Sequence, residues 1–304
     1  MTRREATRVI GGTAASLLVS PNILAQEKGG LIQRAIPSSN EMLPVIGLGT
    51  ARSFDVSASP TDRQPVEEVL ALLVKRGGKL LDTSPMYGRA ELVVGEIAKK
   101  LKLSESLFLA TKVWTTGGEA GIKQMEHSLE LLGTTKLDLI QVHNLVDTAT
   151  HLKTLREWKK SGRVRYIGIT HHTDASQDEV ASILEKERVD FVQINYSLME
   201  REAEKSVFPV AKDRGVAVIV NRPLGAGGLF NRVRGQRLPD WASEFDCTSW
   251  AQFFLKWIVA NPAVTCAIPA TSKPHHMEDN MRACFGRLPD AKMRQRMIEA
   301  VAAL

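Results

Sequence analysis

Four side chains in the sequence have the chemistry needed to deliver a proton. Asp82, Lys112 and His143 each close a short apolar run, and Tyr87 follows Asp82 by five residues. A free phenol has a pKa of about 10 and is a poor acid at neutral pH, but a cation about 4 Å away is worth roughly three pKa units at an effective dielectric of about 20. We therefore expect Lys112 to lower the pKa of Tyr87 and Asp82 to keep Lys112 charged. His143 would orient the oxygen of a bound carbonyl through an imidazole N–H.

Each of these residues, taken alone, has an ordinary explanation. A lysine at a strand end is usually solvated or ion-paired, a histidine there is usually structural, and a tyrosine is usually packing. The occurrence of such groups at successive strand ends favours one shared reactive site.

The elements that must position these residues alternate along the chain from residue 31 onward. The apolar runs expected to be strands are residues 44–48, 79–82, 107–112, 137–143, 165–170, 191–195, 216–220 and 264–268. The amphipathic stretches expected to be helices are residues 65–75, 91–101, 122–132, 151–160, 177–187, 203–214, 249–259 and 274–284, and residues 290–303 form an extra helix.

Eight strand–helix units in about 250 residues predict an α/β fold, a single-domain (β/α)8 TIM barrel with an extra C-terminal helix. A doubly wound open sheet is the alternative, but it normally carries a Gly-rich phosphate turn after its first strand. Residues 47–52, Gly-Leu-Gly-Thr-Ala-Arg, do not have that pattern. In a barrel, the carboxyl ends of all strands open on the same mouth, which would bring the four reactive residues together.

Residues 81–91, Leu-Asp-Thr-Ser-Pro-Met-Tyr-Gly-Arg-Ala-Glu, followed by Gly95, resemble the first signature of the aldo-keto reductases. The strand ends at residues 111–112 and 142–143 match those that carry the family's other two catalytic groups. The resemblance covers nearly all of the chain after residue 25. It implies a barrel without a Rossmann domain that uses NADPH to reduce aldehydes and ketones. By that resemblance Tyr87 is the general acid, Lys112 and Asp82 tune it, and His143 orients the substrate.

The resemblance also implies where the nicotinamide and the pyrophosphate bind. The implied contacts are Gly49, Thr50, Thr170, His171, Gln193, Arg222, Pro223, Leu224 and Gly225. Two positions depart from the family. His171 stands where many members have Asn, and Asn221 replaces the aromatic residue that commonly stacks on the nicotinamide, unless Arg222 covers the ring instead.

A second segment, residues 268–280, resembles the part of the family that binds the adenosine. The implied contacts are Thr271, Ser272, Lys273, His276, Asp279 and Asn280. The hydroxyls of Thr271 and Ser272 and the free N–H groups at the start of the following helix would bind a phosphate. The positive charge of Lys273 and His276 would favour NADPH over NADH through its 2′-phosphate. NADH stays possible, because Ala270 replaces a lysine of many strongly NADPH-selective members and Lys273 could simply be solvated. No metal is expected, since neighbouring histidines such as His275 and His276 point different ways.

Phe54, Trp114 and Leu145 lie on loops expected to line the mouth, which favours a partly apolar carbonyl as substrate. The loops that set specificity do not reveal which carbonyl it is. The alternative function is a nucleotide-sensing or partner-binding barrel with slow or no turnover, which the fold allows.

The composition excludes several other classes of protein. The chain has 304 residues, 43% of them hydrophobic and 24% charged, which excludes a disordered or fibrous protein. The net charge of +6 is spread along the chain, so nucleic acid is not an expected partner. No apolar stretch is long enough for stable membrane insertion, and three scattered cysteines do not form a disulfide framework. We expect a monomer or a small homo-oligomer.

The first 25 residues have the three-part layout of an export signal. Arg3 and Arg4 precede a weakly apolar run at residues 9–19, and Ala25 could stand before a cleavage point. The paired arginines resemble the twin-arginine class, which exports folded proteins, although Ala6 departs from the motif. The sequence therefore predicts an export signal at residues 1–25, a barrel at residues 26–304 and a periplasmic protein. The alternative is a cytoplasmic protein with an N-terminal tail.

Overall fold

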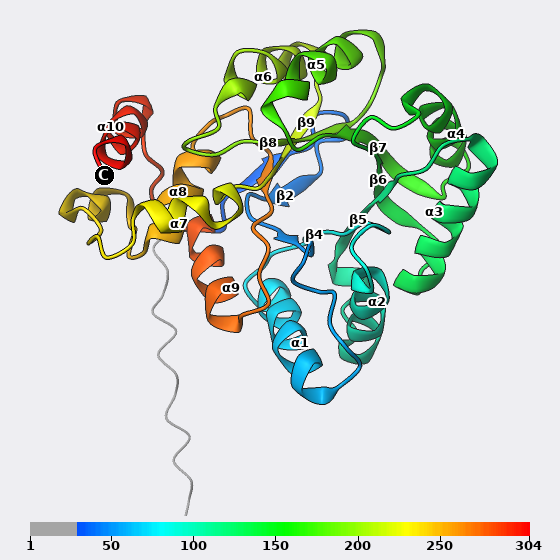
Figure 1. Ribbon diagram of the computed structural model, residues 1–304, viewed down its shortest axis with the longest axis horizontal. Coiled ribbons are helices and arrows are strands. Elements are labelled where there is room, and N and C mark those ends of the chain that lie inside the picture. The colour runs from blue at the N-terminus through cyan, green and yellow to red at the C-terminus, as the bar shows by residue number, and fades with distance from the viewer. Residues whose placement is uncertain (1–28) are drawn as a thin grey trace, which may run out of the picture.

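Eight parallel strands form a barrel in the computed structural model, which describes residues 29–304 (Figure 1). Neighbours around the sheet follow chain order, from β3 (Leu48–Gly49) through β4 (Leu80–Asp82), β5 (Phe108–Val113), β6 (Leu137–His143), β7 (Val164–Thr170), β8 (Phe191–Asn195) and β9 (Ala217–Asn221) to β10 (Cys266–Ala267). Parallel bridges from Ile46 to Ala267 and from Gly49 to Ala270 join the two ends of this order. The predicted (β/α)8 TIM barrel is confirmed, and the open doubly wound sheet is excluded. The predicted export signal at residues 1–25 lies outside the described residues.

Helices surround the barrel on its outside (Figure 1). They are α1 (Pro60–Lys75), α2 (Ala90–Leu101), α3 (Gly118–Leu132), α4 (Thr148–Lys160), α5 (Gln177–Lys186), α6 (Val207–Arg214), α7 (Gly228–Arg232), α8 (Trp250–Val259), α9 (Pro274–Met281) and α10 (Ala291–Ala302). The first helix begins five residues earlier than residue 65, because Ser59 accepts a hydrogen bond from the Asp62 N–H at 3.2 Å and Pro60 suits the first helical turn. None of the helices in residues 29–304 is both long and apolar enough to cross a bilayer.

The N-terminal end of the barrel is closed by a hairpin that the sequence did not predict. β1 (Gln33–Ala35) pairs antiparallel with β2 (Met42–Pro44), so Pro44 belongs to the hairpin and the first barrel strand begins only at Leu48. Ile36 and Leu43 of this hairpin join the apolar cluster inside the barrel, which includes the first residues of several strands. The apolar run at residues 44–48 therefore contains the last residue of the hairpin strand β2 and the residues that lead into the barrel strand β3.

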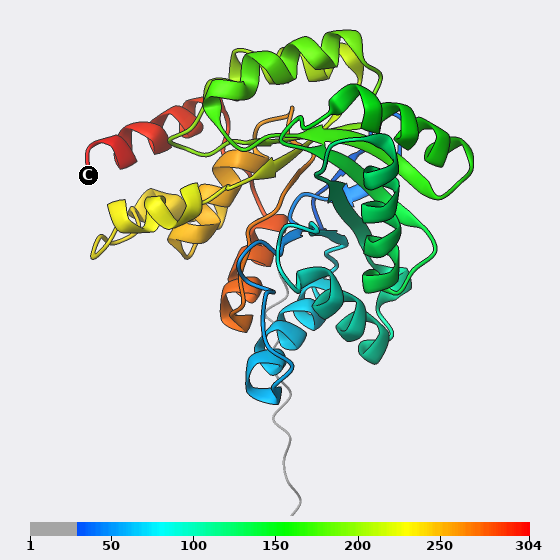
Figure 2. The same cartoon turned by 45° about the vertical axis from the view of Figure 1, so that its right-hand side comes forward.

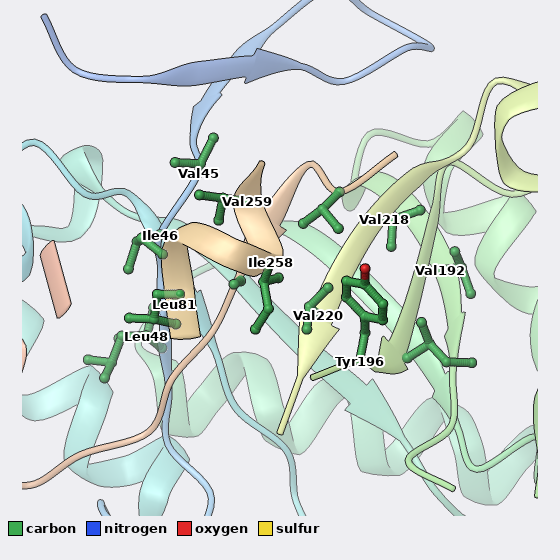
Figure 3. Packing of buried hydrophobic residues seen from close by; sticks show 14 of the residues in the cluster. Val45, Ile46, Leu48, Leu81, Val192, Tyr196, Val218, Val220, Ile258 and Val259 are labelled. Carbon is green, nitrogen blue, oxygen red and sulfur yellow. The ribbon is translucent and has the colours of Figure 1, made fainter. Parts of the chain in front are cut away.

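A larger apolar cluster lies between the strands and the helices (Figure 3). Leu48, Leu81, Val192 and Val220 of the strands belong to this cluster, and so does Ile258 of α8. Residues on each strand thus alternate between the inside of the barrel and this outer layer, as the pleat requires.

The C-terminal helix α10 lies at one edge of the molecule, outside the ring of helices (Figure 2). Arg294 of α10 donates to the Tyr196 hydroxyl at 2.6 Å and to Glu204 at 2.9 Å, and its guanidinium lies 4.5 Å from the centre of the Trp257 ring. At the other end of α10, Arg232 of α7 donates to the carbonyl oxygen of Val301 at 2.8 Å. The predicted extra helix is therefore bound to the barrel by arginine contacts near both of its ends.

Candidate active site

Strand alternation brings the predicted reactive residues to one end of the barrel interior. On β4, Leu80 belongs to the apolar cluster inside the barrel, and Asp82 lies on the same face two residues later. On β5, Lys112 follows Ala110 of that cluster in the same way. Gln193 on β8 and Asn221 on β9 likewise lie two residues after Phe191 and Ile219 of the cluster. His143 on β6 and Thr170 on β7 lie on the same face, four residues after Leu139 and Tyr166. A polar layer therefore lies on top of an apolar one at the carboxyl ends of the strands.

Lys112 and Asp82 form a buried ion pair in this layer. The Lys112 side chain has no exposed surface, and its Nζ donates to Asp82 Oδ2 at 2.6 Å and to the Thr83 carbonyl oxygen at 2.7 Å. Burial lowers the pKa of Lys112, but Asp82 and Tyr87 raise it by more, so the amine keeps its charge. Asp82 Oδ1 accepts from Gln193 Nε2 at 2.8 Å, which holds the carboxylate in place.

Tyr87 lies against this ion pair, with Lys112 Nζ 5.0 Å from the centre of its ring. Burial raises the pKa of Tyr87 above its ordinary value, and Lys112 opposes this only in part. The expected lowering by Lys112 is thus outweighed in the described structure. The physical reason is that Asp82 offsets the charge of Lys112 while the phenol loses hydration. The phenol therefore keeps its proton at neutral pH.

His143 faces Tyr87 edge-on, with ring centres 6.1 Å apart and an angle of 89° between the planes. Burial and the charge of Lys112 lower the pKa of His143 to about 3, so its imidazole is neutral. Its Nδ1 atom lies 3.2 Å from the hydroxyl oxygen of Ser84. A neutral imidazole keeps one N–H donor, which suits the orientation of an uncharged oxygen.

A cavity of about 650 Å³ opens above these groups. Its wall contains ten of the predicted site residues: Gly49, Thr50, Asp82, Tyr87, His143, Thr170, Gln193, Arg222, Pro223 and Leu224. Gly49 is required at the closure of the barrel, because a Cβ there would lie 2.9 Å from the Ile268 carbonyl oxygen. Among residues 29–304, no group of three or more His, Cys, Asp or Glu side chains is placed to hold a metal ion.

Residues 45–300 match the sequence family described as the aldo/keto reductase family. The chain belongs to this family. Aldo-keto reductase YhdN of Bacillus subtilis is 30% identical over 203 residues, which cover 62% of this chain and 60% of that relative. The NADH-specific methylglyoxal reductase of Escherichia coli is 26% identical over 300 residues, or 81% of this chain and 89% of the relative. An aldo-keto reductase structure from Klebsiella pneumoniae in complex with NADPH superimposes with a TM-score of 0.72 at 23% identity, covering 90% of this chain and 95% of that one.

Family membership confirms the predicted family and the predicted class of enzyme, an NAD(P)H-dependent oxidoreductase. Some of the predicted site residues lie outside the cavity wall. Lys112 lies beneath the wall, bound to Asp82. The others outside the wall are His171, Gly225, Thr271, Ser272, Lys273, His276, Asp279, Asn280, Phe54, Trp114 and Leu145.

Three of these residues have positions that differ from the predicted role. Phe54 is fully buried in the outer apolar cluster of the reductase, so it does not line the mouth. The two ring nitrogens of His171 lie 3.2 Å from the hydroxyls of Thr173 and Ser176, which turn it toward its own loop. Asp279 accepts from Ser249 and Gln252, so it joins α9 to α8.

The start of α9 also has fewer free backbone donors than expected. Pro274 has no N–H, and the N–H groups of His276 and Met277 donate to the Lys273 carbonyl oxygen. The N–H of Lys273 itself donates to the Thr271 hydroxyl at 3.0 Å. The side chains of this segment, rather than the helix end, are therefore its main polar groups in the reductase.

Several wall residues of the reductase were not predicted as contacts. They are Ala51, Arg52, Asn144, His172, Asn221, Ala226, Gly227, Phe230, Ile268, Pro269 and Ala270. Arg52, Asn144 and His172 each follow a predicted contact by one or two residues, and that adjacency could have indicated them. Phe230 lies on α7, a five-residue helix with no detectable pattern in the sequence.

Asn221 has an amide group with one unmet hydrogen bond. Its Nδ2 donates to the His171 carbonyl oxygen at 3.0 Å, which orients the amide. Its Oδ1 is buried and has no hydrogen-bond partner among residues 29–304. Because Asn221 lines the cavity, this acceptor is available to a donor bound there.

Proposed function

We propose that the reductase converts aldehydes or ketones to alcohols with a nicotinamide cofactor, using Tyr87 as the proton donor. One observation carries the proposal. A protonated phenol lies at the wall of a cavity, directly above a lysine that is fully buried and ion-paired. Such a phenol can release its proton only when a strong base forms beside it, and a carbonyl oxygen that gains negative charge is such a base.

The protein's residues have separate tasks in this reaction. The bound cofactor supplies the hydride. Tyr87 donates its proton to the carbonyl oxygen, and the charge of Lys112 stabilises the phenolate that is left. Asp82 keeps Lys112 charged through the 2.6 Å ion pair. His143, neutral because its pKa is lowered to about 3, donates an N–H to the same carbonyl oxygen. Lys112 and Asp82 are buried, so their charges act strongly.

The cavity wall fits a nicotinamide dinucleotide. The unpartnered Oδ1 of Asn221 needs a donor, and the carboxamide of a nicotinamide carries one. Thr170 is also part of the wall, and its hydroxyl donates to Gln193 Oε1 at 3.2 Å. Arg52 and Arg222 add two cations to the wall, which suits a pyrophosphate.

We assign NADPH as the preferred cofactor, with NADH possible. Lys273 and His276 provide positive charge for a 2′-phosphate, and the Klebsiella structure holds NADPH. The E. coli relative, by contrast, is named as NADH-specific. Dissociation constants for both dinucleotides, measured by tryptophan fluorescence, decide the preference.

The test of the function is Tyr87→Phe. We expect aldehyde reduction to fall by roughly 100- to 10,000-fold because the general acid is lost. NADPH should still bind with nearly unchanged affinity. Tyr166→Phe is the matched control, since the Tyr166 hydroxyl bonds to Ser39 and Glu41 at the opposite end of the barrel. Retained turnover in Tyr87→Phe refutes the assignment.

A second candidate function is a nucleotide-sensing or partner-binding barrel with slow turnover. It is favoured by Asn221, which replaces a stacking aromatic residue, and by His171, which is turned away from the cavity. The missing ring-stacking contact and the missing His171 contact would weaken binding at the nicotinamide end of the cofactor. Stopped-flow measurement of hydride transfer to a panel of aldehydes separates the two functions. Transfer faster than about 1 per second, the low end of ordinary enzyme turnover, excludes a sensor.

We further propose that residues 1–25 direct the folded protein to the periplasm. Paired arginines at positions 3 and 4 support this, and export after folding would allow the cofactor to be loaded first. Replacing both arginines by lysine should leave the protein in the cytoplasmic fraction. Full-length native protein in that fraction without any replacement would contradict export. Native mass measurement would also report leader cleavage, bound nucleotide and whether the protein is a monomer or a small homo-oligomer.

A further inference from the structure

Ser84 lies beside the catalytic imidazole in the loop that follows β4. Its side chain is fully buried, and its Oγ is 3.2 Å from Nδ1 of His143. The same oxygen accepts a hydrogen bond from the Met86 N–H at 3.2 Å. The hydroxyl is therefore held between the backbone of its own loop and the end of β6.

The direction of the hydrogen bond to His143 follows from the hydrogen count. A serine hydroxyl has one hydrogen and accepts through its oxygen. Met86 already supplies a hydrogen to that oxygen, and Nδ1 of His143 is the one acceptor within reach among the described residues. A fully buried hydroxyl with a single acceptor donates to it, because leaving the hydrogen unpaired costs free energy. Nδ1 must then carry a lone pair.

The direction of this hydrogen bond decides which ring nitrogen of His143 carries the hydrogen, because the imidazole is neutral. Burial and Lys112 lower the pKa of His143 to about 3, so the ring has only one N–H across neutral pH. If Nδ1 has the lone pair, Nε2 has the hydrogen. Nε2 makes no hydrogen bond to residues 29–304, and His143 is part of the cavity wall. The N–H is then free for a ligand in the cavity.

We propose that Ser84 is a positioning residue that holds His143 as the Nε2–H tautomer, with this N–H available to a carbonyl oxygen in the cavity. The inference rests on the proposed reductase function. In the opposite tautomer, Nε2 would present a lone pair to the carbonyl oxygen and repel it. The serine thus decides whether the imidazole can donate to the substrate.

The neighbouring residue shows that the same loop also positions the catalytic cation. The carbonyl oxygen of Thr83 accepts from Lys112 Nζ at 2.7 Å, and the Thr83 N–H donates to the Ala110 carbonyl oxygen at 2.8 Å. Two adjacent residues after β4 therefore orient both groups, Thr83 through its backbone and Ser84 through its side chain. An alanine at position 84 would keep the first contact and remove the second.

The first test measures the tautomer directly. In protein labelled with ¹⁵N-histidine, long-range ¹H–¹⁵N spectra distinguish a protonated ring nitrogen from one with a lone pair, and the His143→Gln spectrum assigns the signals. We expect Nδ1 of His143 to be unprotonated and hydrogen-bonded in the wild type. In Ser84→Ala its signal should shift in the direction of a lost hydrogen bond. A protonated Nδ1 in the wild type overturns the proposal.

The second test separates positioning from binding. In Ser84→Ala we expect single-turnover hydride transfer from NADPH to benzaldehyde to slow about tenfold, which corresponds to about 1.4 kcal/mol. The NADPH dissociation constant should stay within twofold. Ser84→Thr keeps the hydroxyl and should restore both the rate and the Nδ1 signal. Ser128→Ala on α3, which removes a buried hydroxyl that donates to Glu91 of α2, is the control and should leave the rate unchanged.

The outcomes distinguish this proposal from the function on which it rests. If Tyr87→Phe is inactive while Ser84→Ala transfers hydride at the wild-type rate, the positioning role is wrong and the reductase function stands. If Tyr87→Phe remains active, the catalytic assignment fails, and the spectra still report which nitrogen of His143 carries the hydrogen. A rate loss in Ser84→Ala that Ser84→Thr does not restore also contradicts the proposal, provided that Ser84→Thr retains the wild-type melting temperature.

Discussion

The buried ion pair under the candidate active site gives a quantitative stability prediction. Asp82→Asn keeps the shape of the side chain and removes its charge, so Lys112, which has no exposed surface, would keep mainly the Thr83 carbonyl oxygen at 2.7 Å. Breaking a buried ion pair costs about 3–5 kcal/mol. Deprotonation of the lysine sets an upper limit, since its unfolded pKa of about 10.4 makes this cost about 4.6 kcal/mol at pH 7. We therefore expect the free energy of unfolding at pH 7 to fall by about 3–4.6 kcal/mol.

The loss of stability in Asp82→Asn should also depend on pH. In the wild type the pKa of Lys112 is raised, so the folded and unfolded states both hold the proton near neutral pH. In Asp82→Asn the folded state favours the neutral amine, whereas the unfolded chain stays protonated up to a pH of about 10. Unfolding of the variant then takes up a proton, and its stability rises by about 1.4 kcal/mol per pH unit relative to the wild type. The loss at pH 9 should be smaller than at pH 7 by about 2–3 kcal/mol.

Urea unfolding followed by circular dichroism at pH 7 and pH 9 measures both effects. Lys123→Met is the control, because Lys123 and its partner Glu119 are 72% and 84% exposed, and its change should be within about 0.5 kcal/mol. The double variant Asp82→Asn/Lys112→Met should be more stable than the sum of the single changes predicts. An equal loss at both pH values, or simple additivity, would refute the reasoning.

Three further predictions follow from the described contacts. The imidazole of His143, with its pKa lowered to about 3, should show no protonation between pH 5 and pH 8 in an NMR titration, and an inflection near pH 6.5 would contradict this. The stability that the neutral ring contributes is complete above about pH 6.5 and is lost as the pH falls toward 3. Gly95→Ala would place a Cβ in collision with the Leu131 carbonyl oxygen and should lower the free energy of unfolding by about 2–3 kcal/mol. Gly228→Ala is the control in the same denaturation assay; its Cβ would meet nothing within 4 Å, so its effect should be nearly neutral. Arg294→Met should destabilise the fold by about 2–3 kcal/mol in thermal unfolding, because it removes hydrogen bonds to Tyr196 and Glu204. Arg296 is half exposed, so the control Arg296→Met should change stability by less than about 1 kcal/mol.

Strands that are buried on both faces were the easiest elements to predict. The expected strands at residues 137–143 and 191–195 coincide with β6 and β8. All of β8 is buried, and β6 is buried except at Asp138 and His143, which are partly buried. The hairpin at the barrel end was missed. Its strands have three residues each, and the pattern in β1 is mostly exposed, so neither the apolar period nor a turn dipeptide indicates them.

The site was predicted unevenly for a similar reason. Asp82, His143, Thr170 and Gln193 all line the cavity, since a residue at the carboxyl end of a barrel strand has its position set by the strand itself. Residues on long connections were harder. Phe54 lies only a few residues beyond β3, yet it turns into the core, and the segment around Lys273 lies outside the cavity wall.

The sequence by itself determined the family, the barrel and which residue types meet at its mouth, because strand periodicity and strand ends are local properties of the chain. The sequence did not determine the protonation states of these residues. The pKa of Tyr87 was expected to fall and instead is raised, since burial and the charge of Asp82 act on the phenol together with Lys112. The proton on His143 likewise depends on Ser84, which lies 59 positions away in the chain and 3.2 Å away in space. Desolvation and hydrogen-bond direction arise only when distant segments pack together, and so only the tertiary structure decides them.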